Sequence, residues 1–205
     1  DQSYLLFGLK LELLDRMILP LGDLVKAETR AHGDRLGVPN AQKPESQELC
    51  FIPDGDVAGF TRRQLGDSAG GLIVDEDGNR LGEHEEIAGF TIGKRRGLSL
   101  GGGTRGPRYV LRILPETRTV VVGEGERLES STLRAEDAHF FRTPPSGPFR
   151  AKVRIRYRHE PADATIVPSA GGFDVNFDTP QRAITPGQAA VIYSGDEVQG
   201  GGFIV

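Results

Sequence analysis

Hydrophobic positions along the chain change from a helical period near the N-terminus to a strand period over the remainder. Leucines recur at the three- and four-residue spacing of one helix face from Leu5 to Leu13, and Met17 continues the pattern. This spacing predicts one helix up to about Met17. A second helix is predicted from about residue 24 to 36, where Gly37 is a typical helix-ending residue.

Short β-rich runs begin after about Phe51 and are separated by turn residues. The dipeptide Asp77-Gly78 predicts one hairpin turn, and Pro115-Glu116-Thr117 predicts a second. The predicted strands of this central part are Leu72–Val74, Ile87–Ile92, Arg108–Ile113 and Thr119–Val122.

A second series of β-rich runs follows the proline-rich stretch Thr143–Pro148. These runs lie at 149–158, 163–168, 172–177, 189–193 and 198–205, with a possible extra run near 182–184. Their spacing, with turn residues between them, predicts a small closed β-barrel of about six strands. We therefore expect a mostly β chain with N-terminal helices, divided into 1–52, a β-rich central domain at 53–135, and the barrel at 136–205.

Basic residues occupy every second position from Arg150 to Arg158, and the residues between them are apolar or aromatic. In a regular strand this pattern places the cations on one face, where neighbours about 6.5–7 Å apart repel one another. Two arrangements would compensate that repulsion. Acidic residues on neighbouring strands can neutralise the cations, with Asp163, Asp174 and Asp178 as the candidates. Alternatively, the cations can follow the phosphates of a nucleic acid.

The overall composition gives little information about partners. The 205 residues carry a formal net charge of −4, so any RNA-binding surface must be local. The 28 glycines and 13 prolines agree with many turns and short strands. No apolar run approaches the roughly 18–20 residues of a membrane span, so no membrane association is expected. A single cysteine without an export signal suggests a cytoplasmic location.

Several short motifs allow two interpretations. The triplet Lys94-Arg95-Arg96 is either a solvated turn or a contact to an RNA backbone, and the glycines at 101–103 are interpreted as a flexible connector rather than a phosphate loop. The acids around His84 could perform acid–base chemistry but are more typical of a solvated turn. No pair among the histidines and the cysteine has zinc-site spacing, so no metal site is predicted.

The single cysteine, Cys50, lies between a run rich in acid and amide groups and a Pro-Asp-Gly turn. One thiol cannot form an internal disulfide, so the fold does not depend on one. Cys50 is either a small buried hydrophobic residue or a sulfur nucleophile or carrier.

The run Ser46–Ile52 resembles the persulfide-cysteine motif of the tRNA-specific 2-thiouridylases. Further matches to the same family follow its order along the chain and span nearly all of it. They are Asp1–Tyr4, Pro20–Leu24, Gly89–Leu98, Arg108–Val110 and Thr185–Gln188.

This resemblance implies an enzyme that transfers sulfur from a persulfide on Cys50 to C2 of the wobble uridine of tRNA. In the family, the ATP-binding loop and a first catalytic cysteine, which becomes disulfide-bonded to the matched cysteine, precede the position of Asp1. We therefore expect a C-terminal part of a longer enzyme, inactive alone and without bound ATP. The implied partners are tRNA and a sulfur-donor protein, either a cysteine desulfurase or a relay protein.

The resemblance also makes 1–52, which includes the Cys50 loop, the remnant of an α/β ATP-binding catalytic domain. Its helices are then expected to expose their apolar faces.

The residues that match tRNA-contacting positions of this family are Asp1, Gln2, Arg156, Tyr157 and Gln188. A regular strand would place Arg156 and Tyr157 on opposite faces, so both can contact RNA only at a strand end or a bulge. The alternative to an enzyme is a non-catalytic RNA-binding β-module in which Cys50 is structural.

Overall fold

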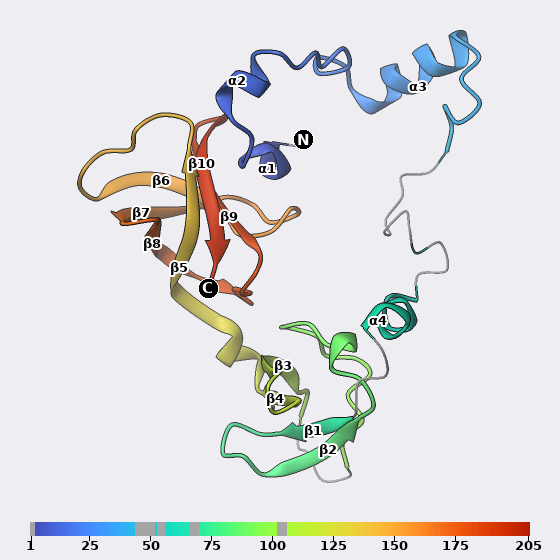
Figure 1. Ribbon diagram of the computed structural model, residues 1–205, viewed down its shortest axis with the longest axis vertical. Helices are drawn as coiled ribbons and strands as arrows, with labels where there is room; N and C mark the ends of the chain where they lie inside the picture. Colours follow the sequence, from blue (N-terminus) through green and yellow to red (C-terminus); the bar gives the residue numbers. More distant parts are fainter. Residues whose placement is uncertain (1–2, 44–51, 53–55, 66–69, 102–105) are drawn as a thin grey trace.

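The computed structural model describes residues 3–43, 52, 56–65, 70–101 and 106–205. Helices lie near the N-terminus, and most of the later described chain forms a small sheet and a closed barrel (Figure 1). The prediction of a mostly β fold with N-terminal helices and a C-terminal six-stranded barrel is confirmed. The exact division into three domains remains a prediction.

The helices of the described residues are α1 (Ser3–Leu6), α2 (Leu11–Leu14), α3 (Lys26–Arg35) and α4 (Val57–Leu65). The second predicted helix corresponds to α3, and Gly37 follows it with a φ of 67°. The single helix predicted up to Met17 is wrong, because the chain forms α1 and α2 instead. Tyr4 and Phe7, rather than the leucines, are buried against the barrel. Gly8 follows directly and is a poor helix former.

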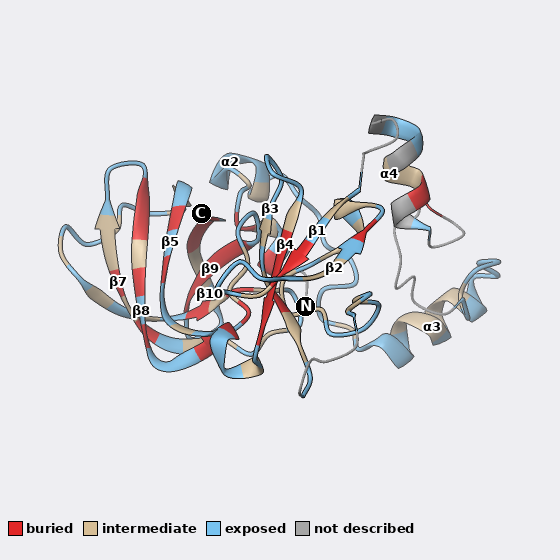
Figure 2. Cartoon of the chain, turned by 90° about the horizontal axis from the view of Figure 1, so that it is seen from below, coloured by how far each residue is buried: buried red, intermediate tan, exposed pale blue. Residues whose placement is uncertain are grey.

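Large apolar side chains of the N-terminal segment remain exposed, as the resemblance implied. Figure 2 shows little burial over α2 and α3, in contrast to the strands. The exposed side chains are Leu5, Leu11, Leu13, Met17, Ile18, Leu19, Leu21, Val25, Leu36 and Val38. Within the described chain, α2 and α3 therefore gain little stability from packing.

The central sheet has the strand order β2-β1-β4-β3. Its strands are β1 (Gly71–Val74), β2 (Arg80–His84), β3 (Tyr109–Leu114) and β4 (Thr119–Gly123). β1 pairs with β4 in parallel, and the two hairpins β1–β2 and β3–β4 are antiparallel. Both predicted hairpins are thus confirmed, and Gly78 in the first turn has the positive φ, 85°, that glycine tolerates best.

The predicted strand at Ile87–Ile92 is wrong. The chain instead forms a short 3₁₀-helix, η1 (Ile87–Gly89). Ile87 and Phe90 both pack against the core of the central sheet. Residues three apart share a face in a helical turn but point to opposite faces in a strand, so the turn buries both.

The barrel closes in the order β10-β5-β8-β7-β6-β9, with every neighbouring pair antiparallel. Its strands are β5 (Glu129–Phe140), β6 (Phe149–Arg154), β7 (Ala162–Ser169), β8 (Gly172–Arg182), β9 (Ala189–Ser194) and β10 (Glu197–Ile204). The sixth strand is β5, not the run near 182–184, and it begins before the expected boundary at 136. Large side chains fill the interior, among them Phe173, Ile166 and Ile192.

Candidate nucleic-acid interface

The basic residues from Arg150 to Arg158 do not share one strand, because β6 ends at Arg154. The prediction of a regular strand over 149–158 is therefore wrong beyond that residue. The ladder on the β9 side ends there, with Arg154 opposite Val191, while the pairing to β7 has already ended at Val153. The alternating sequence continues past the end of the sheet, and its cations divide into two groups.

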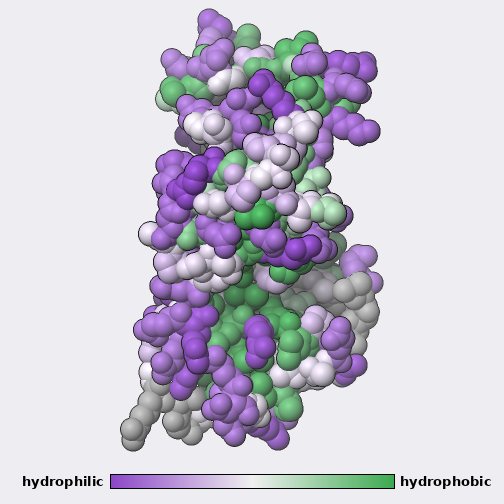
Figure 3. All heavy atoms as spheres, turned by 90° about the vertical axis from the view of Figure 1, so that its left-hand side faces the viewer, coloured by the Kyte–Doolittle hydropathy of each residue, from purple (hydrophilic) through white to green (hydrophobic). Residues whose placement is uncertain are grey.

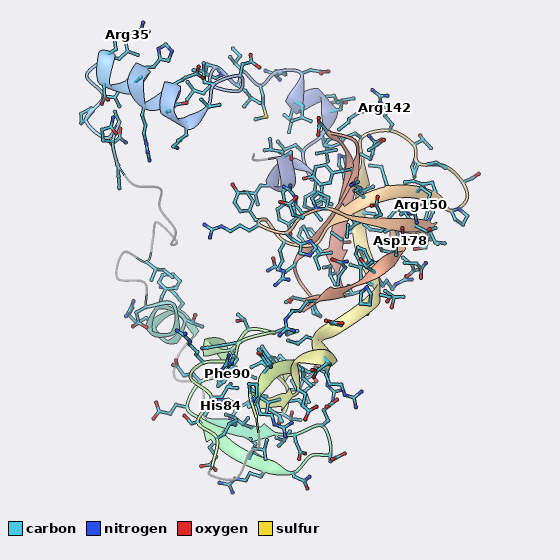
Figure 4. All side chains as sticks on the ribbon, turned by 180° about the vertical axis from the view of Figure 1, so that it is seen from behind. Arg35, His84, Phe90, Arg142, Arg150 and Asp178 are labelled. Atoms are coloured by element: carbon cyan, nitrogen blue, oxygen red, sulfur yellow. The ribbon has the colours of Figure 1, made fainter. Side chains whose placement is uncertain are left out.

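The first group is neutralised on the outer surface of the barrel. The Arg150 guanidinium donates to the Asp178 carboxylate, with Nη1 2.7 Å from Oδ1, and this bond holds the pKa of Asp178 below its ordinary value. Lys152 Nζ lies 3.9 Å from Asp163 Oδ2. Figure 4 shows Arg150 and Asp178 together on this surface, which is largely hydrophilic in Figure 3. For these two cations the acidic-neighbour interpretation holds.

The second group lies at the end of β6 and in the turn that follows it. Ile155 still points into the barrel core, whereas residues 156–158 form a turn in which the His159 N–H donates to the Arg156 carbonyl at 3.0 Å. Arg156 is half-buried and Tyr157 is 41 % exposed. Because these residues have left the strand, Arg156 and Tyr157 are not forced onto opposite faces. This is the strand-end geometry that a shared RNA contact requires.

Tyr4 of α1 contacts both this turn and strand β9. Its ring packs edge-on against Tyr157 at a centroid distance of 6.3 Å, and its hydroxyl donates to the Ala189 carbonyl at 2.9 Å. Burial raises the pKa of Tyr4, although the nearby charges of Arg156 and Arg154 act in the opposite direction. Figure 1 shows α1 resting against the barrel on this side.

Arg154 and Arg156 are held by specific contacts at the base of this surface. The Arg154 guanidinium lies over the Tyr193 ring, 5.3 Å from its centroid, and the Tyr193 hydroxyl lies 3.1 Å from Ser3 Oγ. Arg156 Nη2 donates to the Arg182 carbonyl at 2.8 Å. These contacts limit the rotamers of both arginines, which lowers the entropy cost of binding an anion.

Gln188 is exposed and lies one residue before Ala189, the acceptor of the Tyr4 hydroxyl. Its turn is fixed to β10, because the Gly187 N–H donates to the Ile204 carbonyl and the Ile204 N–H donates to the Gln188 carbonyl, both at 2.8 Å. Tyr4 therefore contacts Tyr157 through its ring and the residue after Gln188 through its hydroxyl. We call Tyr4, Arg154, Arg156, Tyr157 and Gln188 the Tyr4 surface.

The predicted site residues Cys50, Asp1 and Gln2 lie outside the described residues, so their placement is not part of the structure. Asp1 and Gln2 precede Ser3 and Tyr4 directly in the sequence. Sequence reasoning missed Tyr4 itself. The signal was present, since Tyr4 and Phe7 have the three-residue spacing of a helix face distinct from the leucines.

The central sheet holds the other candidates from the sequence. Figure 4 shows His84 beside Phe90, with ring centroids 5.1 Å apart, and His84 Nε2 lies 3.0 Å from the Arg118 carbonyl. These contacts give His84 a packing role. His84 and Phe90 also line an open cavity of about 1270 Å³ between the sheet and η1. Among the described residues, no group of three or more His, Cys, Asp or Glu side chains could hold a metal ion. No described helix is long and apolar enough to cross a membrane.

Three family models match consecutive parts of the chain. They are described as a tRNA methyl transferase HUP domain at residues 1–54, a tRNA methyl transferase PRC-barrel domain at 58–124, and an aminomethyltransferase beta-barrel domain at 130–204. The last two agree with the positions of the central sheet and the barrel.

Curated relatives match the whole chain. The chain is 44 % identical over 206 residues to the tRNA-specific 2-thiouridylase MnmA of Syntrophotalea carbinolica, covering 100 % of this chain and 58 % of that protein. It is 44 % identical over 218 residues to the protein of the same name from Acidobacterium capsulatum, again with 100 % and 58 % coverage. For the Acetivibrio thermocellus protein, also so named, identity is 42 % over 207 residues with 100 % and 57 % coverage. The chain thus spans somewhat more than half the length of these relatives.

Proposed function

Since the chain belongs to the tRNA-specific 2-thiouridylase family, we propose that it provides the tRNA-holding surface and the persulfide cysteine of such an enzyme. The Tyr4 surface binds tRNA, and Cys50 carries the sulfur that is transferred to C2 of the wobble uridine. The use of ATP, a sulfur-donor protein as partner and a cytoplasmic location belong to the same proposal, as does inactivity of this part alone.

The observation that supports RNA binding most strongly is the end of β6 at Arg154. Arg150 and Lys152 lie before this end and pair with carboxylates on the outer surface of the barrel, whereas Arg156 and Tyr157 lie in the turn after it, against α1. Arg150 and Lys152 are paired with the carboxylates of Asp178 and Asp163, so the sheet itself accounts for their charge. The Arg154 guanidinium lies over the Tyr193 ring, and Arg156 Nη2 donates to the Arg182 carbonyl.

The chemistry of the Tyr4 surface suits a folded RNA. Guanidinium groups bind phosphate oxygens with directed, charge-assisted hydrogen bonds. The exposed Tyr157 ring offers a face on which an unpaired base can stack, and Gln188 can donate and accept hydrogen bonds. Phosphate contacts of this type fix the position of the RNA, and they do not read its sequence.

Cys50 has a separate role in the proposal. In the thiolation reaction ATP activates the C2 oxygen of the uridine by adenylation, which turns it into a leaving group. The terminal sulfur of the Cys50 persulfide either attacks C2 itself or is first released as hydrosulfide that attacks C2, and in both routes AMP departs with the former C2 oxygen. The thiolate of the family's first catalytic cysteine attacks the Cys50 sulfur, which breaks the S–S bond and leaves a disulfide between the two cysteines and the terminal sulfur on the uridine. A persulfide is more acidic than a thiol and is therefore more fully ionised at neutral pH, so Cys50 needs little electrostatic assistance.

The binding proposal is tested by replacing the three arginines at and after the end of β6, Arg154→Ala, Arg156→Ala and Arg158→Ala, in the intact enzyme. We expect weaker tRNA binding and a smaller dependence of affinity on salt, because each lost phosphate contact lowers the slope of log K against log[salt] by about 0.7–0.9. Fluorescence anisotropy with labelled tRNA at several salt concentrations measures both quantities.

A matched control removes the same number of charges elsewhere. Arg80, Arg134 and Arg142 are exposed and form ion pairs with Glu83, Glu136 and Glu197 respectively. Their triple alanine variant has the same change in net charge but should retain the wild-type slope. Equal slopes for the wild type and the variant at 154, 156 and 158 would refute RNA binding by these residues.

The carrier role is tested by Cys50→Ser in the intact enzyme. Because serine cannot form a persulfide, we expect thiolation of tRNA to be abolished while the affinity for tRNA stays near the wild-type value. Mass spectrometry of digested tRNA detects the 2-thiouridine, and anisotropy measures binding. Normal thiolation by this variant would eliminate Cys50 as the carrier without affecting the proposal for the Tyr4 surface.

A further inference from the structure

The turn at residues 93–97 is built to hold one shape. Gly93 and Gly97 have φ angles of 84° and 72°, in the left-handed region where glycine is least strained. The Gly93 N–H donates to the Val110 carbonyl at 2.8 Å, and the Val110 N–H donates to the Lys94 carbonyl at 2.9 Å. Two hydrogen bonds therefore fasten the start of the turn to β3.

The three cations of this turn have different roles. Lys94 is half-buried, its Nζ donates to the Gly89 carbonyl at 2.5 Å, and it lies 5.5 Å from the centroid of the Phe90 ring. Lys94 thus stabilises the turn from inside. Arg95 and Arg96 are exposed, and their side chains form no hydrogen bond or ion pair with any residue that the structure describes. Their charge is available to an external anion.

The turn lies beside the barrel at the edge of the Tyr4 surface. A Cβ added to Gly93 would be only 3.3 Å from the Ala183 Cβ. Ala183 follows Arg182, whose carbonyl accepts the hydrogen bond from Arg156. In Figure 1 the green segment after β2 reaches towards the lower end of the barrel, in agreement with this contact.

Arg182 also fixes the central sheet to the barrel at this point. Its guanidinium lies over the Tyr109 ring, 5.0 Å from the centroid, and Nη1 donates to the Gly125 carbonyl at 3.2 Å. Tyr109 is the first residue of β3, the strand to which the 93–97 turn is bonded. The same residue therefore holds Arg156 through its carbonyl and β3 through its side chain.

We propose that Arg95 and Arg96 form a second phosphate-binding site, which extends the RNA-binding surface from the barrel onto the central sheet. This inference depends on the proposed function, since it assumes that tRNA occupies the Tyr4 surface. A tRNA backbone bound at Arg156 then continues past Ala183 to the two arginines. Because the turn is already rigid, little ordering is required when the phosphates bind.

The test is the double variant Arg95→Ala, Arg96→Ala in the intact enzyme, with tRNA binding measured from low to moderate salt. We expect weaker binding at each salt concentration and a slope of log K against log[salt] that is smaller by about 1.4–1.8, the value for two lost phosphate contacts. The variant Arg95→Lys, Arg96→Lys, which keeps both charges, should retain most of the wild-type slope.

The control is Arg80→Ala, Arg127→Ala, which removes the same charge from the central part of the chain. Both residues are exposed and form ion pairs, with Glu83 and Glu76 respectively. If the double variant at 95 and 96 has the wild-type slope while the Arg154, Arg156 and Arg158 variant does not, the second site is refuted and the proposed function stands. If the wild type shows no salt-dependent tRNA binding, both are refuted.

Discussion

Arg156 combines several structural contacts with the binding role that we propose for it. Its guanidinium donates to the Arg182 carbonyl, its carbonyl accepts from His159, and its charge affects the ionisation of both Tyr4 and His159. The sequence singled out Arg156 and Tyr157 through the resemblance. Tyr4 could not be recognised as their partner, because that contact joins residues distant in the chain and has no local sequence pattern.

His159 provides a probe of this arrangement. Burial lowers its pKa below the ordinary value of 6.5, and the positive charge of Arg156 lowers it further. Arg156→Ala removes the second cause but not the first, so the pKa of His159 should rise and still remain below 6.5. An NMR titration of the imidazole protons measures the midpoint, with Arg80→Ala as the control. The same midpoint in Arg156→Ala and in the wild type would contradict the placement of Arg156.

At the scale of elements, β9 and β10 are among the strands that the sequence predicted well, since both appear close to their expected bounds. β9 is a short apolar run whose first five residues are all buried, a pattern that also indicates a strand. β5 was missed as the sixth strand because few of its residues are fully buried, mainly Leu133 and Ala135, and most of the others are polar and exposed. The end of β6 was also beyond prediction, since it is set by where β7 and β9 stop pairing.

The outer surface of the barrel should respond to acid through Asp178. The hydrogen bond from Arg150 lowers the pKa of this carboxyl below its ordinary value of 3.8, so the stabilisation is present above that pH and is lost as the pH falls through the lower folded-state value. Asp178→Asn should therefore lower the melting temperature slightly at neutral pH, and the difference from the wild type should disappear in strong acid.

Thermal melts followed by circular dichroism from neutral to acidic pH test this expectation. Asp196→Asn, an exposed position in the turn between β9 and β10, is the control. A destabilisation by Asp178→Asn that persists unchanged into strong acid would show that the ion pair is not its cause.

For the whole molecule, family membership and fold class could be predicted from the sequence. The contacts that join the helices, the central sheet and the barrel could not. The order of helices, central sheet and barrel follows from patterns within each segment. The contacts of Arg182 with Tyr109 and Gly125, and of α1 with β9, join segments distant in sequence that carry no common pattern. The charge of the 93–97 turn made it a candidate RNA contact from the sequence, but its position beside the barrel, with Gly93 next to Ala183, could not be predicted.

The N-terminal helical segment also shows the limit of prediction from a local pattern. Its helical period was visible, but the predicted continuous helix requires a surface to cover its leucines, and the described chain offers one only to Tyr4 and Phe7. The hydrophobic period predicts which side chains a helix can bury on one face. Whether they are buried depends on a packing surface elsewhere in the molecule.

The most direct test of the central claim is oxidative footprinting of the intact enzyme with and without tRNA. Tyr157 is 41 % exposed on the Tyr4 surface, while Leu72 and Leu114 are 40 % and 38 % exposed on the central sheet. We predict that saturating tRNA sharply slows oxidation of Tyr157 and leaves Leu72 and Leu114 unchanged. Undiminished oxidation of Tyr157 in the saturated complex would contradict tRNA binding at the Tyr4 surface.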